Sequence, residues 1–272
     1  MRILTYNVHS CIGTDGRCVP ERIVDVIAAC APDVVCLQEL DVGRMKTGGI
    51  DQAHVIGRSL GMEMHFHAAV RVMEEQFGDA ILTSLPSQLV RAGPLPGLSG
   101  MPLGRWGETR GALWAAIDIG GATVQVFNTH LGLRPREQMV QMPALAGPEW
   151  LGHPDCVDPV LLAGDFNAFP GTRAYRYLAS FLDDAQMAPA VRQPRATFPG
   201  RAPIIRIDHV FSRGSVEIVS AQVIRTRLSR VASDHLPLLV EVRVPAAQTD
   251  LSDRDKRRPA AEPRERPQPA GR

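Results

Sequence analysis

The 272-residue sequence contains no apolar run that approaches the roughly 20 residues a membrane-spanning helix needs. Its first ten residues, MRILTYNVHS, have one Arg and a very short apolar stretch, which does not match a signal peptide. Cysteine is scarce. The five cysteines form no Cys-x-x-Cys pair, so a disulfide framework or a zinc-thiolate site is not predicted. We expect a cytoplasmic protein without a membrane span, and a monomer.

Charge of one sign is also lacking, because 30 Lys and Arg stand against 29 Asp and Glu. Residues 246–272 differ from the rest, with four prolines, twelve charged residues and no aromatic residue. This composition predicts a disordered tail after one domain over residues 1–245. Residues 1–245 retain 23 basic and 24 acidic residues. They lack the overall basic excess that is typical of proteins binding long stretches of nucleic acid.

Short runs of β-forming residues recur along the domain and are separated by Gly- and Pro-rich connections. Helical periodicity appears in three segments between them, 21–30, 51–60 and 172–182. The mixture predicts an α/β or α+β fold. The expected strands lie at 2–8, 33–39, 80–85, 112–119, 123–131, 159–167, 206–212, 216–224 and 237–244.

Polar motifs of a few residue types adjoin six of these runs: TYNVH, LQE, NTHL, GDFNA, IDHVF and SDHLP. Strand ends at one edge of packed sheets converge, so we expect these side chains to share a cleft. Carboxylate and amide oxygens are ligands for Mg²⁺ or Mn²⁺. Histidine beside a carboxylate suits acid–base catalysis near neutral pH. This set predicts metal-assisted attack of water on a phosphorus centre.

The six motifs, in this order, resemble those of the endonuclease/exonuclease/phosphatase superfamily over nearly the whole domain. The resemblance implies the DNase I fold, a four-layer sandwich in which helices flank two packed mixed β-sheets. It also implies a Mg²⁺-dependent phosphoric ester hydrolase, with Mn²⁺ as a possible substitute. The metal-site residues would be Asn7, Glu39 and Asp234.

The same resemblance assigns the catalytic residues. Asp165 would orient or deprotonate the attacking water, and Asn167 would hold a phosphoryl oxygen. Because residues two apart share a face of a strand, both can point into one cleft. His235 would contact the scissile phosphate or its water, and Asp208 would orient His235. His130 would protonate the leaving group or stabilise the charge of the transition state.

Some residues give weaker signals. Arg110 could clamp a phosphate through its planar guanidinium, or could be an ordinary surface residue. Asn128 lies two residues before His130 and could contact substrate. Glu75 is a candidate for orienting His130. Asp79 stands where many relatives have Asn.

The substrate remains open among nucleic acid, nucleotide and lipid head group. The charge balance favours a small-substrate or end-processing phosphodiesterase over a high-affinity nuclease, and a cytoplasmic lipid phosphodiesterase is also compatible. An inositol-polyphosphate 5-phosphatase is disfavoured, because such relatives carry a PxWxDR-type segment where this chain reads IIRIDHVF. The alternative from a different class is a non-catalytic binding module on the same fold, which the filled catalytic positions disfavour.

Overall fold

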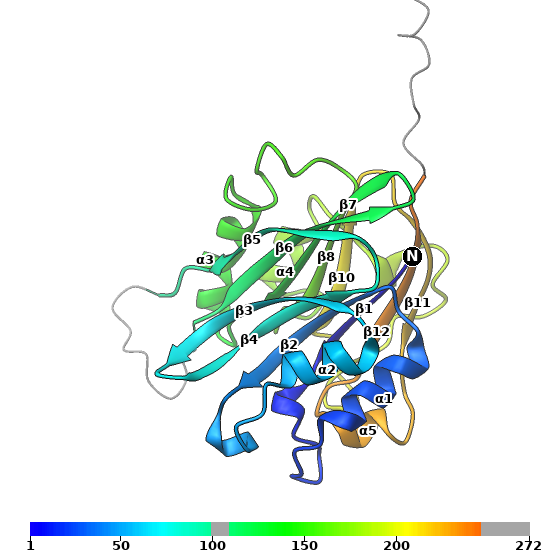
Figure 1. Ribbon diagram of the computed structural model, residues 1–272. Helices are drawn as coiled ribbons and strands as arrows, with labels where there is room; N and C mark the ends of the chain where they lie inside the picture. Colours follow the sequence, from blue (N-terminus) through cyan, green and yellow to red (C-terminus); the bar gives the residue numbers. More distant parts are fainter. Residues whose placement is uncertain (99–108, 246–272) are drawn as a thin grey trace, which may run out of the picture.

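The computed structural model describes residues 1–98 and 109–245. The predicted tail over 246–272 lies outside these residues. The described chain forms two six-stranded mixed sheets, drawn in Figure 1. The first sheet has the order β11 (Glu217–Val223), β12 (Leu238–Arg243), β1 (Arg2–Asn7), β2 (Val34–Val42), β4 (Glu75–Thr83), β3 (Glu63–Val72). The second has the order β5 (Ser87–Pro94), β6 (Gly111–Ile119), β7 (Ala122–His130), β8 (Val160–Asp165), β10 (Asp208–Arg213), β9 (Asp183–Asp184).

The helices cover the outer faces of both sheets. In Figure 1, the first sheet carries α1 (Pro20–Cys30), α2 (Gln52–Leu60) and α5 (Ser229–Ala232). The second sheet carries α3 (Pro135–Ala146) and α4 (Arg173–Leu178) on its other side. Three 3₁₀ turns, His9–Cys11, Met45–Thr47 and Ala185–Met187, complete the elements of the described chain. Among the described helices, none is long and apolar enough to cross a membrane.

Alternation along the strands produces three apolar cores and hence four layers. On β1, Ile3 packs into the core between the two sheets, whereas Leu4 packs into the core under α1 and α2. On β8, Leu161 faces the first sheet, whereas Leu162 faces α3 and α4. Strands buried on both faces are continuous apolar runs, which explains why these were visible in the sequence. The predicted DNase I-like sandwich is confirmed.

The ends of the predicted helices follow local signals. Pro20 is at the first turn of α1, where its missing N–H costs nothing. The Asp51 side chain caps α2 by accepting from the backbone N–H of His54 at 2.9 Å. Helix α3 was not predicted, because Pro143 lies inside it and interrupts the helical pattern.

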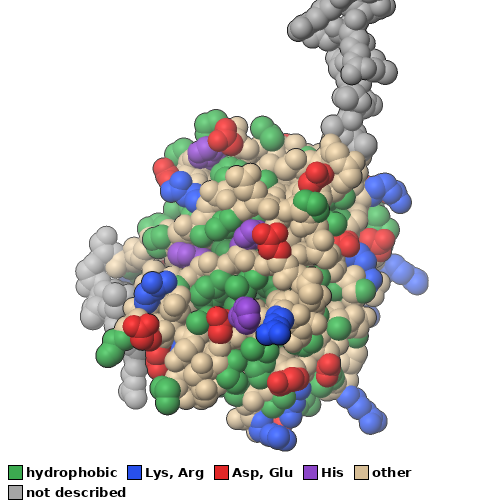
Figure 2. Space-filling view, in the orientation of Figure 1, with side chains coloured by type: hydrophobic (Ala, Val, Ile, Leu, Met, Phe, Trp, Pro, Cys, Tyr) green, Lys and Arg blue, Asp and Glu red, His purple; other side chains and the backbone are tan. Residues whose placement is uncertain are grey.

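Charged side chains of both signs are distributed over the surface. On the face drawn in Figure 2, Lys and Arg side chains are interspersed with Asp and Glu side chains. This distribution agrees with the near-neutral charge of the domain. It gives that face no single stripe of positive charge among the described residues.

Candidate active site

A row of three buried side chains crosses the second sheet where β8 ends. The parallel pairing of β7 and β8 places His130 opposite Asp165. The antiparallel pairing of β8 and β10 places Asp208 on the other side of Asp165. All three residues are at most 2% exposed. Sheet register alone therefore brings together three of the residues predicted from sequence.

The first sheet supplies Glu39 through an irregularity in β2. The register between β2 and β4 shifts between Leu37 and Leu40. Glu39 lies in this interval with φ of 61°, which is uncommon for a non-glycine residue. Such a bulge redirects a side chain, and Glu39 lines the same pocket as His130 and Asp165. The buried carboxylate of Asp79 accepts from the backbone N–H of Glu39 at 3.4 Å, which supports this conformation.

Asn7 connects the two sheets at the site. Its amide nitrogen donates to Oε1 of Glu39 at 2.9 Å and to Oδ2 of Asp165 at 3.0 Å. Its Oδ1 accepts from the backbone N–H of His9 at 3.0 Å, which fixes the orientation of the amide. Asn7 therefore turns carboxylate oxygens from both sheets toward a common point.

His235 is paired with a carboxylate on each side. Its Nδ1 lies 2.9 Å from Oδ2 of Asp208, and its Nε2 lies 3.7 Å from Oδ2 of Asp165. Burial alone would lower the pKa of His235, but the charges of Asp208 and Asp165 outweigh it and raise the pKa to about 10. The ring of Phe198 packs against this histidine at a centroid distance of 4.9 Å.

His130 has a different partner. Nη1 of Arg110 lies 2.9 Å from its Nδ1, and both residues are buried. Its Nε2 lies 3.2 Å from Nδ2 of Asn167 and 3.5 Å from Oδ2 of Asp165. Burial, followed by the positive charge of Arg110, holds the pKa of His130 well below its ordinary value of 6.5.

Asp165 and Asn167 form a tight turn immediately after β8. The backbone N–H of Asn167 donates to Oδ1 of Asp165 at 2.9 Å, and Asn167 has φ of 48°. The side-chain amide of Asn167 donates to the carbonyl of Leu131 at 2.9 Å. The two residues face one cleft as predicted, but through this turn and not through strand alternation. Burial raises the pKa of Asp165 to about 7, against the lowering effect of His235.

Asp234 lies at the more open edge of the site. Its side chain is 37% exposed, and its Oδ1 lies 3.8 Å from Nδ1 of His9. Ser233 donates through its Oγ to Oδ1 of Asp234 at 3.4 Å. This carboxylate is therefore accessible to a ligand in the pocket.

These side chains surround one pocket of about 410 Å³. Asn7 and Asp208 contact its lining residues from behind. Three apolar residues also line it and were missed from sequence, because an apolar residue in a loop carries no chemical signal of its own. The full lining is Glu39, Arg110, His130, Leu133, Asp165, Asn167, Phe198, Ile207, Asp234 and His235.

Two weaker predictions are wrong. Asn128 does not reach the pocket. It is fully buried between the sheets, where its amide donates to the carbonyls of Leu37 and Ala80. Glu75 does not orient His130, because its carboxylate accepts from the backbone N–H of Met45 and lies 3.8 Å from Arg44.

The donor set of the pocket fits a hard divalent cation. Glu39, Asp165 and Asp234 supply carboxylate oxygens, the ligand type that Mg²⁺ prefers. The amide nitrogen of Asn7 already lies within hydrogen-bond distance of one carboxylate oxygen of Glu39 and one of Asp165. Ligand atoms of Asp165, Asp208 and His235 also lie within 4.8 Å of one another. However, Asp208 and His235 are hydrogen-bonded to each other. The carboxylates of Glu39 and Asp234 are therefore the better candidates for metal ligands.

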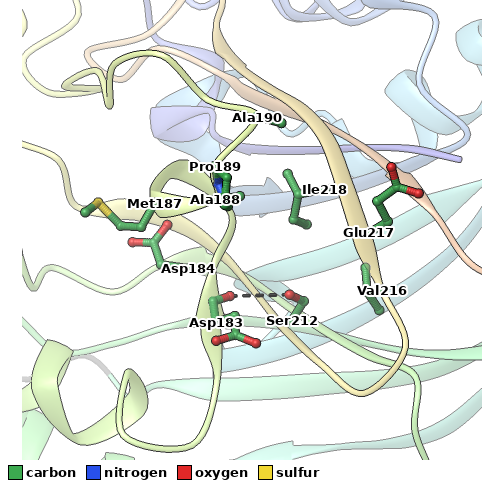
Figure 3. Close-up of a pocket in the computed structure, with 10 residues that line it drawn as sticks. All are labelled: Asp183, Asp184, Met187, Ala188, Pro189, Ala190, Ser212, Val216, Glu217 and Ile218. Carbon is green, nitrogen blue, oxygen red and sulfur yellow. Dashed lines mark hydrogen bonds between the residues drawn. The ribbon is translucent and has the colours of Figure 1, made fainter.

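A second cavity, of about 530 Å³, lies between the segment after β9 and strand β11 (Figure 3). Its lining includes Asp183, Asp184 and Glu217 but no histidine. Asp184 is paired with Arg206 at 2.9 Å, and Glu217 is paired with Arg243. Two of its three carboxylates are thus engaged in ion pairs, and it lacks the histidines of the first pocket, which is therefore the candidate active site.

Comparison with known proteins identifies relatives along most of the chain. The model of the endonuclease/exonuclease/phosphatase family matches residues 4–235. A protein of Escherichia coli K12, named uncharacterized protein YbhP, is 27% identical over 253 residues, covering 89% of this chain and 95% of its own.

Solved structures share the fold. An endonuclease/exonuclease/phosphatase from Beutenbergia cavernae aligns with a TM-score of 0.68 at 24% identity, over 89% of this chain and 71% of its own. The mannosyl-6-phosphatase Bt3783 of Bacteroides thetaiotaomicron aligns with a TM-score of 0.69 at 20% identity, over 89% of this chain and 99% of its own.

Proposed function

The chain belongs to the endonuclease/exonuclease/phosphatase family, and on that premise we propose that it is a Mg²⁺-dependent phosphodiesterase. The observation that carries this proposal is the convergence of Glu39, Asp165 and Asp234 with two histidines in one pocket. A pocket that joins carboxylates, imidazoles and an amide can bind a cation, activate water and stabilise negative charge.

The metal ion would be held by the carboxylates of Glu39 and Asp234. Asn7 would orient Glu39 and Asp165 through its amide nitrogen, since its oxygen is occupied by the backbone of His9. A bound divalent ion supplies a Lewis acid for a phosphoryl oxygen. Mn²⁺ has the same preference for oxygen ligands and could replace Mg²⁺.

The remaining chemistry belongs to the protein's own side chains. Asp165 would orient the attacking water and accept its proton while the oxygen of that water bonds to phosphorus. The ester oxygen would then leave phosphorus with its bonding electrons. His235, which Asp208 holds as a cation, would stabilise the charge on the phosphoryl group. Asn167 and His130 would contact the phosphoryl group from the side of Asp165 that is opposite His235.

The dimensions and charge of the pocket favour a small phosphate ester or the end of a nucleic-acid strand as substrate. A volume of about 410 Å³ is at the lower end of ligand pockets. Arg110 is the one arginine or lysine that lines it among the described residues. Three apolar residues, Leu133, Phe198 and Ile207, also line it. A lipid head group, a nucleotide or a processed end is compatible with this lining.

A phosphatase acting on a monoester is the second candidate. The structural neighbour from Bacteroides thetaiotaomicron is named a mannosyl-6-phosphatase, and a sugar phosphate is small enough for such a pocket. A non-catalytic binding module is disfavoured, because every predicted catalytic side chain is present in the site.

A substrate panel tests the proposal. We would measure hydrolysis of bis(p-nitrophenyl) phosphate, p-nitrophenyl phosphate, supercoiled plasmid and 5′-tagged single strands, each with Mg²⁺, Mn²⁺ or EDTA. We expect metal-dependent cleavage of the small diester and little cleavage within the plasmid. Preferential cleavage of the monoester would favour the phosphatase. The absence of metal-dependent turnover on all four would support the binding module.

A further inference from the structure

The two histidines of the pocket have opposite partners behind them. The Nδ1 of His235 faces the carboxylate of Asp208, which accepts a hydrogen bond from an N–H group at this ring position. The Nδ1 of His130 faces the guanidinium of Arg110, which has N–H groups and no acceptor. The same ring atom is therefore a donor in His235 and an acceptor in His130.

This contact fixes where the proton of His130 resides. A neutral imidazole carries its hydrogen on one nitrogen only. Because Nδ1 accepts from Nη1 of Arg110 at 2.9 Å, the hydrogen must be on Nε2. Arg110 is only 8% exposed and His130 only 2%, so water does not compete for the contact.

The Nε2–H group has Oδ2 of Asp165 at 3.5 Å on one side and the amide of Asn167 on the other. Nδ2 of Asn167 lies 3.2 Å from Nε2 of His130 and also donates to the carbonyl of Leu131 at 2.9 Å. Turning the amide around would set its oxygen against that carbonyl. Two N–H donors therefore lie side by side at the pocket wall, and neither can accept from the other. Such a pair of donors suits an anionic oxygen placed between them.

We propose that Arg110 is a positioning residue that holds His130 in its Nε2–H form, so that His130 and Asn167 together donate to one phosphoryl oxygen. Arg110 acts through His130 and not as a direct clamp on the phosphate. The assignment of this tautomer is independent of the reaction, whereas its use in catalysis rests on the hydrolysis proposed above.

The first test observes the tautomer directly. The ¹⁵N shifts of the histidine rings distinguish a protonated from an unprotonated nitrogen, and would be recorded for the full-length protein in EDTA. The His130 signals would be assigned by their loss in His130→Gln. We expect Nε2 to be protonated and Nδ1 unprotonated. A protonated Nδ1 in the wild type would overturn the proposal. If His130→Gln does not fold, correlations from the ring to the His130 backbone signals give the same assignment.

Variants then test the cause. Arg110→Met should remove the preference for Nε2–H, and Arg110→Lys should restore it in part because lysine still donates. Arg213→Met is the matched control. Arg213 also makes several hydrogen bonds, to Asp158, Leu151 and Cys156 at the opposite end of the sheet, so its loss should leave the His130 signals unchanged. An unchanged spectrum in a folded Arg110→Met protein would contradict the proposal.

Kinetics separate positioning from direct contact. On the best substrate of the panel, His130→Ala should lower kcat about 10²-fold, as expected for a lost donor to a developing charge. Arg110→Met should approach that loss, and the double variant should fall no further than His130→Ala. A double variant well below His130→Ala would make Arg110 a direct phosphate ligand. If the wild type shows no turnover, the proposed function fails while the ring spectra still decide the tautomer.

Discussion

Asp165 is the residue on which the contacts of the site converge. Its carboxylate accepts from the amide of Asn7 and from the backbone N–H of Asn167, and it faces Nε2 of both histidines. These neighbours fix its position from both sheets. The carboxylate that we propose as the base for the attacking water is therefore held from several directions.

The pairing of His235 with Asp208 predicts a specific dependence on pH. Asp208→Asn removes the largest of the causes that raise the pKa of His235, so this pKa should fall well below about 10. The folded-state pKa lies above the ordinary 6.5. The pair therefore stabilises the fold fully below pH 6.5, and this contribution is lost as pH rises through about 10.

Denaturant unfolding of the metal-free wild type and Asp208→Asn at pH 6.5 and pH 10.5 measures the effect. We expect the wild type to lose more free energy of unfolding between these pH values than the variant. Equal losses in the two proteins would show that Asp208 does not set the charge of His235.

At this scale the sequence predicted the polar residues at strand ends well, because they adjoin apolar runs. Glu39 and Asp165 follow such a run, whereas Asp234 precedes one. The sequence could not predict how far each side chain lies from the open end of its strand. Asn128 and His130 share a face of β7, but only His130 is at the open end. The amide of Asn128 donates its hydrogen bonds to backbone carbonyls of the first sheet. The contact between Arg110 and His130 joins residues from different segments and leaves no local pattern.

At the scale of elements, Gly164 allows β8 to deliver Asp165. It lies opposite Thr129 in the parallel pairing with β7. A Cβ at this position would lie within 2 Å of the carbonyl oxygen of Thr129, with φ of 151°. Only glycine permits this approach of the two backbones.

Gly164→Ala should therefore lower the free energy of unfolding by about 3 kcal/mol or more, and reduce turnover because Asp165 is displaced. Gly171→Ala is the control, since Gly171 also has positive φ, 99°, but nothing within 4 Å of its Cβ position. It should cost only about 1 kcal/mol. Denaturant unfolding gives both values, and equal costs would contradict the close approach.

The strands predicted from sequence are all present. Most are conspicuous because they are buried on both faces, whereas β11 is a half-buried edge strand with strong β-forming residues. The strands that were missed lie at sheet edges. Residues of β3 and β5 are mostly half-buried or exposed, so their apolar pattern is diluted. The bulge at Glu39 was also unpredictable, since it depends on the pairing of β2 with β4 and on the buried Asp79.

At the scale of the whole molecule, the site exists only where the two sheets meet. Asn7 and Glu39 come from the first sheet, and His130, Asp165 and Asp208 from the second. The apolar core between the two sheets sets the distance between these two groups of residues. The sequence indicated this convergence through the polar motifs at strand ends, but not which sheet carries each motif.

The proposed reaction needs a metal ion in this pocket, so removal of the ion should abolish turnover. EDTA should stop hydrolysis in the wild type, and Mg²⁺ should restore it. Glu39→Ala should mainly raise the Mg²⁺ concentration needed for half-maximal activity, because a carboxylate ligand is lost. A wild-type Mg²⁺ titration in that variant would remove Glu39 from the ligand set.

The most direct measurement is hydrolysis of bis(p-nitrophenyl) phosphate by wild type, Asp165→Ala and His235→Ala after chelation and readdition of Mg²⁺. Circular dichroism and thermal unfolding would establish that all three proteins are folded. We predict turnover by the wild type only with Mg²⁺, and rates lower by about 10²- to 10⁴-fold in each variant. Turnover in EDTA, or near-wild-type turnover by either variant, would contradict a metal-dependent hydrolase built on Asp165 and His235.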